Sequence, residues 1–336
     1  MTTLLPSPVV TVAVATYNSA DYVEAAVASA LGQSVAAIEV IAVDDCSSDD
    51  TVDRLRRIAA RDARLRVERL PVNSGPAAAR NRAMSLARGR WYAVLDSDDI
   101  YAPDRLERLL AAATEHKADI VADNLVTFID GDPASARFHL EPGPGGSAFG
   151  IDDYLSQSLI FGRGSDPGFL KPMIDLDRLR EHGIAYDERL RIGEDDDLMV
   201  RLLMSGFRYR IEPHPTYAYR KHAASISHRL SQDNARAMLC SAAEVARRGA
   251  DANAAPALEA RARAFARALA FTQLIDALKA RRLGEFARIG VRDPAALALL
   301  RMPLAAAWHR VFLKTKDPPP APENPAAVAA LRQIVG

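Results

Sequence analysis

Residues 91–99 read WYAVLDSDD, an apolar run followed at once by Asp96, Ser97, Asp98 and Asp99. Short strands that are almost wholly apolar are typical of a sheet covered on both faces. Comparable runs occur at Val9–Ala15, Ile38–Val43 and Leu65–Leu70, with helix-length amphipathic stretches between them. This alternation predicts an α/β fold with a mostly parallel, Rossmann-like sheet flanked by helices. In such a sheet, ligands bind at the carboxyl ends of the strands.

Start signals support the helices between these strands. Each helix follows a capping residue or a proline, the residue types favoured at helix N-termini. We expect the helices at Ala20–Leu31 after Ser19, Thr51–Ala60 after Asp49 and Asp50, Ala77–Ala87 after Pro76, and a further helix from Pro103.

The chain after residue 118 is less regular. We expect a strand at Asp119–Ile129, then a loop over Gly131–Gly150 because this stretch is rich in glycine and proline and lacks periodicity. Helices are expected to dominate Ile151–Ile211, with a strand at Phe207–Ile211. Beyond His228, 17 of the 45 residues from Arg236 to Ala280 are alanine, which favours helix. The expected organisation is a catalytic domain at 1–230, a C-terminal helical region at 231–316, and a Pro-rich linker with a short tail helix at 317–336.

Composition excludes several classes of protein. The 336 residues hold 43 Lys and Arg against 43 Asp and Glu, so bulk charge gives no reason to expect nucleic-acid binding. The two cysteines, Cys46 and Cys240, provide neither a disulfide scaffold nor a CxxC zinc site. We find no signal-peptide pattern at the N-terminus and no apolar run of about 20 residues that could span a membrane. These features predict a cytoplasmic protein.

A basic segment at 279–316 breaks the overall balance, with nine Lys and Arg against Glu285 and Asp293. Its end is amphipathic, since Trp308 and Phe312 stand among basic residues. One interpretation is a helix that packs on the catalytic domain or on a second copy in a homodimer. The other is peripheral contact with the anionic inner face of the cell membrane.

Acidic and polar clusters follow the expected strands. After Leu95, the Asp-x-Asp spacing of Asp96 and Asp98 suits a site for Mg²⁺ or Mn²⁺, whose remaining positions would take diphosphate oxygens. Adjacent carboxylates at Asp44 and Asp45 can accept from a base or a ribose hydroxyl, whereas the Ser47–Asp49 stretch is explained by turn and cap formation.

Further clusters lie elsewhere in the chain. Thr16-Tyr17-Asn18 after the first strand could cover a planar base, although turn formation alone also explains it. Glu194 and Asp195 stand in a run of four acids ahead of an expected helix, where the helix dipole favours ionised carboxylates; an ionised carboxylate facing a hydroxyl is a general base. The remaining polar residues near strand ends are Asn73, Arg80, Arg220 and His222.

Together these strings resemble family-2 glycosyltransferases with the glycosyltransferase A fold. The resemblance covers about residues 9–228 and keeps the family's order of motifs. The matching strings are Thr16-Tyr17-Asn18, Asp44-Asp45 through Thr51, Asn73-Ser74-Gly75 with Arg80-Asn81, Asp96-Ser97-Asp98-Asp99, Gly193-Glu194-Asp195 through Arg201, and Tyr219-Arg220 with His222, Ser225 and Ser227.

The resemblance implies a nucleotide-sugar donor, a divalent metal and an inverting single displacement. Carried over to this chain, Tyr17 and Asp45, with Asp44, would hold the base, while Arg80 would approach the base or the ribose. Asp96 would bind the ribose. The metal would lie on Asp98, assisted by His222. Asp195 would deprotonate the acceptor, and Glu194 would position the acceptor or the backbone.

The resemblance also suggests the substrates. The chain looks like the soluble glucosyltransferases of succinoglycan-type pathways, which implies transfer of one glucose from UDP-glucose to a lipid-linked saccharide. The Gln-x-x-Arg-Trp string and membrane spans of processive synthases are missing from the sequence, which favours single addition.

Three positions depart from the family's pattern. Ala15 stands where proline is common, Cys46 where glycine is common, and Asp196 where an aromatic residue often contributes to an acceptor platform. The first two should change turn stiffness more than chemistry. The third leaves the shape of the acceptor site open.

Two other classes of function remain as alternatives. One is a different nucleotide-dependent transferase, which the missing P-loop and dinucleotide fingerprints disfavour. The other is a non-catalytic protein that binds nucleotide sugars, for which the loss of Asp98 or Asp195 would have been evidence.

Overall fold

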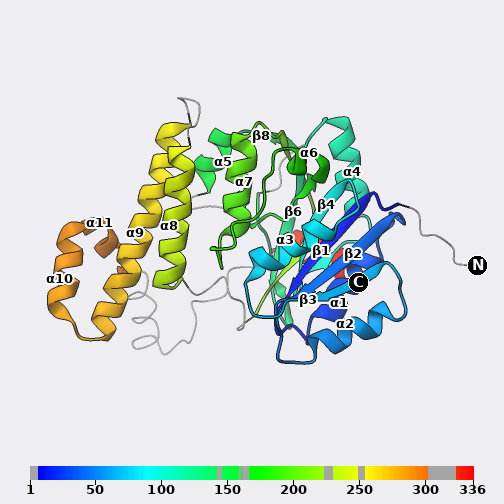
Figure 1. Ribbon diagram of the computed structural model, residues 1–336, viewed down its shortest axis with the longest axis horizontal. Coiled ribbons are helices and arrows are strands. Elements are labelled where there is room, and N and C mark those ends of the chain that lie inside the picture. Colours follow the sequence, from blue (N-terminus) through cyan, green and yellow to red (C-terminus); the bar gives the residue numbers. More distant parts are fainter. Residues whose placement is uncertain are drawn as a thin grey trace, which may run out of the picture. The chain divides into compact units, whose positions relative to one another are not determined.

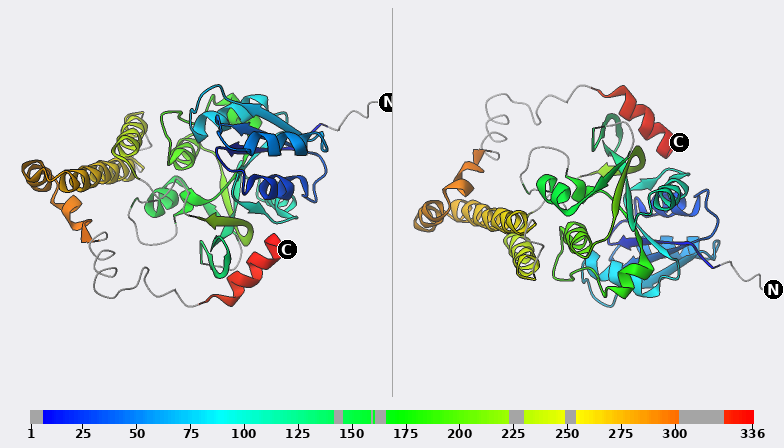
Figure 2. Two further views of the ribbon diagram at one scale, coloured as in Figure 1. Left: turned by 90° about the horizontal axis from the view of Figure 1, so that it is seen from below. Right: turned by 90° about the horizontal axis from the view of Figure 1, so that it is seen from above.

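The computed structural model describes residues 7–141, 146–158, 160, 166–222, 230–248, 254–301 and 323–336. These residues divide into two compact units (Figures 1 and 2). The first unit comprises Met1–Tyr154, Ser165–Ala223 and Glu323–Gly336, and the second comprises Leu155–Gly164 and Ala224–Pro322.

One mixed sheet forms the centre of the first unit, with the strand order β3-β2-β1-β4-β9-β6-β10-β5. The four strands at one end of this order, β3, β2, β1 and β4, are parallel, as the sequence predicts. Burial explains their composition, because every residue of β2 is buried and only one of β1 is not. The bounds are β1 Val10–Thr16, β2 Ile38–Asp44, β3 Leu65–Arg69, β4 Trp91–Asp96, β5 Ile100–Tyr101, β6 Ile120–Ile129, β9 Met173–Asp175 and β10 Tyr209–Lys221.

The helices of this unit connect the strands in the expected order. Right-handed crossovers put α1 and α2 on one face and return the chain over the other face through α3. Leu55 of α2 and Ala83 of α3 are among the residues that these helices bury. The bounds are α1 Val23–Leu31, α2 Thr51–Ala59, α3 Pro76–Leu86, α4 Arg105–Glu115, α6 Leu176–Glu181 and α7 Glu194–Met204, with a 3-10 turn, η1, at Pro167–Phe169. Helix α5, Ile151–Gln157, begins in the first unit, and its residues from Leu155 onward belong to the second.

Two sequence predictions are wrong in the middle of the chain. The expected loop at 131–150 contains β7, Asp132–Phe138, which pairs with β6, and β8, Ser147–Phe149, which pairs with β10. The expected helical stretch at 151–211 contains β9, which runs antiparallel between β4 and β6. These strands are stabilised by partners that are distant in sequence, so local periodicity does not reveal them. The expected strand at Phe207–Ile211 is the start of the longer β10.

The tail helix α13, Pro325–Val335, belongs to the first unit (Figure 2). It packs on β7 and β10, and its buried side chains join one apolar cluster. The cluster consists of Ala102, Val126, Phe128, Ala136, Ala218, Ala327, Val328, Leu331 and Ile334.

The second unit contains α8, Gln232–Arg247, and α9, Ala255–Lys279, which pack along each other, and the shorter α10, Leu283–Arg292, and α11, Pro294–Ala298. Gln232 donates to Asp276 at 2.6 Å and links α8 to α9. On α10, Leu283 is 68% and Val291 82% exposed. The amphipathic end of the basic segment, residues 302–316, lies outside the described residues, as do Ser225 and Ser227. No helix in the described parts of the chain combines the length and apolar character needed to cross a bilayer.

Candidate active site

Strand register brings the predicted clusters to one edge of the sheet. Thr16 is the register partner of Asp44, and Ala15 is the partner of Asp96. The carboxyl ends of β1, β2 and β4 therefore lie side by side. The residues that follow these strands, including Tyr17 and Asp45, share this edge.

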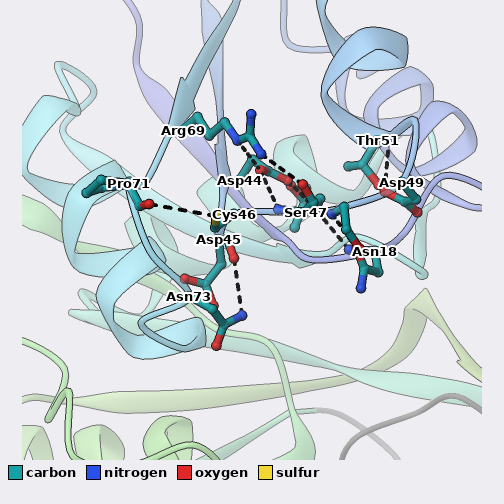
Figure 3. A network of polar contacts seen from close by, with 12 residues as sticks. Asn18, Asp44, Asp45, Cys46, Ser47, Asp49, Thr51, Arg69, Pro71 and Asn73 are labelled. Carbon is teal, nitrogen blue, oxygen red and sulfur yellow. Dashed lines mark hydrogen bonds and ion pairs between the residues drawn. The ribbon is translucent and has the colours of Figure 1, made fainter.

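The loop after β2 presents one carboxylate at this edge (Figure 3). Asp45 accepts from the backbone N–H groups of Ser74 at 2.6 Å and Gly75 at 2.8 Å. Asn73 donates its side-chain amide to the Asp45 carbonyl at 3.1 Å. Gly75 has φ +96°, a conformation that favours glycine, so this close approach suits the residue present. The loop with Asn73 is thereby fixed against Asp45, while Tyr17, 43% exposed, lies on the surface nearby.

Asp44 and Asn18 support this edge from within (Figure 3). Asp44 is fully buried, and its carboxylate accepts from Thr16 at 3.2 Å and from Ser47 at 2.5 Å. The Asn18 side-chain oxygen accepts from the Ser48 N–H at 2.9 Å. In this conformation both side chains hold the loops of this edge in place.

Cys46 is one of the three departures from the family's pattern, and it stands where glycine is common. Its φ is +63°, a left-handed conformation in which glycine is the usual residue. The Cys46 thiol donates to the Pro71 carbonyl oxygen at 3.8 Å. Replacing glycine by cysteine here thus affects the turn and leaves Asp45 in place.

A buried ion cluster lies at the end of β4. Arg80, 4% exposed, contacts Asp96 at 2.7 Å and Asp195 at 3.1 Å, and it also pairs with Glu194. Lys171 completes the cluster at 2.8 Å from Asp96 and 2.9 Å from Asp195. The fold therefore brings Asp96 together with the two acids of α7, which are about 100 residues away in sequence. Arg80 joins the two acids of α7 to Asp96, the residue that the resemblance assigns to the ribose.

The cluster fixes the charges of its members. Burial opposes ionisation of Asp96, but Lys171 and Arg80 outweigh it and hold the pKa of Asp96 well below its usual range. Burial also raises the pKa of Glu194, although Arg80 opposes this shift. Against the effect of burial, nearby carboxylates raise the pKa values of both Arg80 and Lys171 well above their ordinary values, so both side chains stay charged. The cluster therefore holds two cations close to the three carboxylates of Asp96, Glu194 and Asp195. Such an arrangement suits a site that must hold an ionised base away from water.

Asp98 and His222 form a second pair beside this cluster. The His222 Nε2 atom lies 2.8 Å from the Asp98 carboxylate. Burial and the neighbouring Asp96 carboxylate raise the pKa of Asp98, although His222 lowers it. A carboxylate crowded in this way gains from a nearby cation, and carboxylate and imidazole both bind Mn²⁺. Two protein ligands fit a metal that keeps open positions for diphosphate or water.

Within the described parts of the chain, no group of three or more metal-binding side chains occurs. Asp98 and His222 bring together two side chains of metal-binding type. Ser97, half-buried, separates Asp96 from Asp98 along the chain.

Aromatic and ionic contacts hold His222 in place. Its ring stacks on Tyr22 at 4.7 Å between centroids, and Tyr22 donates to Asp130 at 3.3 Å. Arg220 lies over the same Tyr22 ring, pairs with Asp130, and donates to the Asp98 carbonyl at 2.9 Å. Arg220 thus supports the Asp98–His222 pair from both sides.

The buried Asp99 anchors the same turn. It accepts from Tyr217 at 2.7 Å and from the Arg220 N–H at 2.8 Å. Burial raises its pKa well above the ordinary value, and Asp98 and Asp96 add to this shift. These contacts join the end of β4 to β10, so residues 96–99 and residues 220–222 are held against each other.

Sequence reasoning missed Lys171, Tyr22 and Tyr217. Lys171 precedes the three-residue strand β9, in a stretch expected to be helical. Tyr22 lies outside the strings that resemble the family, so the sequence gives no reason to assign it to the site. The only available signal for Lys171 was an isolated lysine before Pro172 in an otherwise apolar segment.

Comparisons with known proteins agree with this geometry. Residues 11–162 match the family model "Glycosyl transferase family 2". Over 335 residues, the chain is 37% identical to the succinoglycan biosynthesis protein ExoO of Rhizobium meliloti, covering 98% of this chain and 95% of that protein.

Solved structures agree on the fold. TarS of S. aureus, residues 1–349 in complex with UDP, superposes with a TM-score of 0.56 at 18% identity, covering 85% of this chain and 91% of that one. The mannosyltransferase PcManGT of Pyrobaculum calidifontis, in complex with GDP-Man and Mn²⁺, also gives 0.56, at 21% identity and over 97% of this chain and 86% of that one.

The fold and the acidic edge of the sheet define a glycosyltransferase with the glycosyltransferase A fold. The chain belongs to glycosyltransferase family 2, as its similarity to ExoO along nearly the whole of both chains shows.

Proposed function

We propose that this glycosyltransferase transfers one glucose from UDP-glucose, with inversion, to a hydroxyl of a lipid-linked saccharide during exopolysaccharide synthesis. The observation that carries the proposal is the ion cluster in which Arg80 and Lys171 join Asp96 to Asp195, with the Asp98–His222 pair beside it. The name of the relative ExoO supports the pathway, and the UDP bound to TarS supports the donor class.

The donor would bind along the carboxyl ends of β1, β2 and β4. Tyr17 would cover the base, Asp45 and Asn73 would line it, and Asp96 would accept from the ribose. A Mn²⁺ or Mg²⁺ ion on Asp98 and His222 would neutralise charge on the leaving diphosphate. The Mn²⁺ named with the Pyrobaculum calidifontis structure supports this cofactor class.

Transfer needs one base and one leaving group. The acceptor oxygen attacks the anomeric carbon, Asp195 takes the hydroxyl proton, and the bond from that carbon to the diphosphate oxygen breaks. Glu194, one residue before Asp195 and paired with Arg80, would position the acceptor or the backbone beside the base. A single displacement of this kind inverts the configuration at the anomeric carbon.

Nucleotide titration tests the donor site. Calorimetry with UDP, GDP, dTDP and CDP, each with and without Mn²⁺, should give metal-dependent binding of UDP. The Asp98→Ala variant should lose the effect of Mn²⁺ on binding. Binding of none of the four nucleotides would refute the proposal.

The Asp195→Asn variant tests the base. It should still bind UDP but lose about 10²–10⁴-fold in turnover, the usual contribution of a positioned proton acceptor. Retained turnover would refute the assignment of Asp195.

We further propose that the second unit holds the enzyme at an anionic membrane surface. Leu283 and Val291 of α10 are exposed, and Arg282, Arg288 and Arg292 lie on or beside the same helix. Charge reversal of these three arginines should abolish flotation with vesicles that contain an anionic lipid. Unchanged flotation would refute membrane contact, and sedimentation of the same samples would reveal a homodimer.

A further inference from the structure

Lys171 is a buried lysine with two carboxylate partners. Its side chain is 8% exposed, and Nζ lies 2.8 Å from Asp96 and 2.9 Å from Asp195. Burial disfavours the ammonium ion, but Asp195 and Asp96 outweigh it and raise the pKa of Lys171 well above the ordinary value. The residue therefore stays charged at neutral pH, as a fixed cation between the two acids.

The fold accounts for the position of Lys171. Strand β9 runs antiparallel to β4, with Met173 opposite Ala93, so the residues before β9 lie beside the carboxyl end of β4. The buried Arg105 donates to the Lys171 carbonyl at 2.6 Å. Arg105 is itself fixed by Asp123 at 2.6 Å. The backbone of Lys171 is thus tied to the core, and its side chain has a fixed origin.

The two cations of the cluster differ in what they join. Arg80 contacts both acids of α7 as well as Asp96. Lys171 places one ammonium group between a single oxygen of Asp96 and a single oxygen of Asp195. Removing Lys171 would leave both carboxylates paired with Arg80, so the cluster would stay partly neutralised. Asp195 would then lose the contact that restrains its second oxygen.

We propose that Lys171 is a positioning residue that holds the Asp195 carboxylate at a fixed distance from Asp96, so that the base faces the acceptor hydroxyl. The proposal rests on the proposed function, because it takes Asp195 as the base and Asp96 as the ribose ligand. Lys171 acts through Asp195, whose carboxylate it contacts at 2.9 Å. Its role is to fix the position of the base, Asp195, relative to the ribose ligand, Asp96.

The test uses hydrolysis of UDP-glucose with Mn²⁺, in which water takes the place of the acceptor. Lys171→Met removes the charge and keeps an unbranched chain. Misplacing a catalytic group by about 1 Å costs about 100-fold in rate, so we expect kcat to fall by about that factor. KM and the dissociation constant of UDP should change less than about threefold, because Asp96 keeps Arg80 as a partner.

Chemical rescue separates positioning from folding. In Lys171→Ala, n-propylamine supplies the three carbons and the ammonium group that the substitution removes, and it should restore kcat by about tenfold or more. Tetramethylammonium, which cannot donate a hydrogen bond, should not. Lys117→Met, the same chemical change at an exposed lysine of the first unit, should leave kcat unchanged.

The outcomes are distinct. Full kcat in Lys171→Met, or a fall in kcat matched by equal losses of UDP affinity and thermal stability without amine rescue, overturns the positioning role. Absence of both UDP binding and hydrolysis in the wild type refutes the proposed function itself, and the role of Lys171 with it. A selective fall in kcat with amine rescue supports both.

Discussion

The packing of α13 on the first unit gives a measurable prediction for Leu331→Ala. Leu331 is 2% exposed and lies in the cluster with Phe128 and Ala218. Truncating a buried leucine costs about 2–5 kcal/mol, from lost burial and from the cavity left behind. Four of the nine buried cluster members are alanines, which have no side-chain freedom to fill the space, so we expect about 3 kcal/mol.

Thermal unfolding followed by circular dichroism and by calorimetry measures this loss. At about 2–4 °C per kcal/mol for a unit of this size, the melting temperature of the first unit should fall by about 6–12 °C. Val335→Ala is the matched control, because Val335 lies on the same helix and is 45% exposed. It should shift the transition by less than about 2 °C. Equal shifts for the two variants would refute the packing of α13.

Three further predictions concern single residues. Asp119→Asn should lower the free energy of unfolding, measured with urea at pH 7, by about 1–2 kcal/mol. Burial raises the pKa of Asp119, but Arg208 and Arg178 outweigh it and lower this pKa. The stabilising contribution of Asp119 is therefore present above about pH 4 and is lost as the pH falls through the lowered native pKa. A stability difference between the Asp119→Asn variant and the wild type that stays constant down to about pH 2 would contradict this. Cys46→Gly should stabilise by about 0.5–1 kcal/mol, because it relieves a left-handed φ of +63°, whereas Cys46→Ala should not; equal effects would rule strain out. Tyr22→Leu should weaken Mn²⁺-dependent UDP binding about 10-fold by releasing His222, and Tyr22→Phe should keep it, since the stacked ring remains. Loss of binding in both variants would assign the effect to the Asp130 contact instead.

The parallel half of the fold is well predicted by the sequence. Strands β1 to β4 have local signals, since burial on both faces selects continuous apolar runs. Helices α2 and α3 begin within one residue of their predicted starts, whereas α1 begins at Val23 and not directly after Ser19. The prediction that the carboxyl ends of these strands share an edge is confirmed by the pairing of Thr16 with Asp44 and of Ala15 with Asp96.

The rest of the site depends on contacts between distant segments. Strand β9 has three residues and two antiparallel neighbours, so its stability comes from pairing with β4 and β6 rather than from its own composition. Lys171 reaches the site only through that pairing. The pairing of Arg80 with Glu194 and Asp195 likewise joins segments that are far apart in the sequence.

The position of α13 has a consequence for protein synthesis. The helix completes the core of the first unit, yet the residues of the second unit, Ala224–Pro322, are translated before it. At about 5–20 residues per second, a ribosome needs about 5–20 s to make those residues. During that interval the nascent sheet exposes the apolar surface that Val328, Leu331 and Ile334 later cover. The unfinished chain is thus open to chaperones and proteases until α13 emerges.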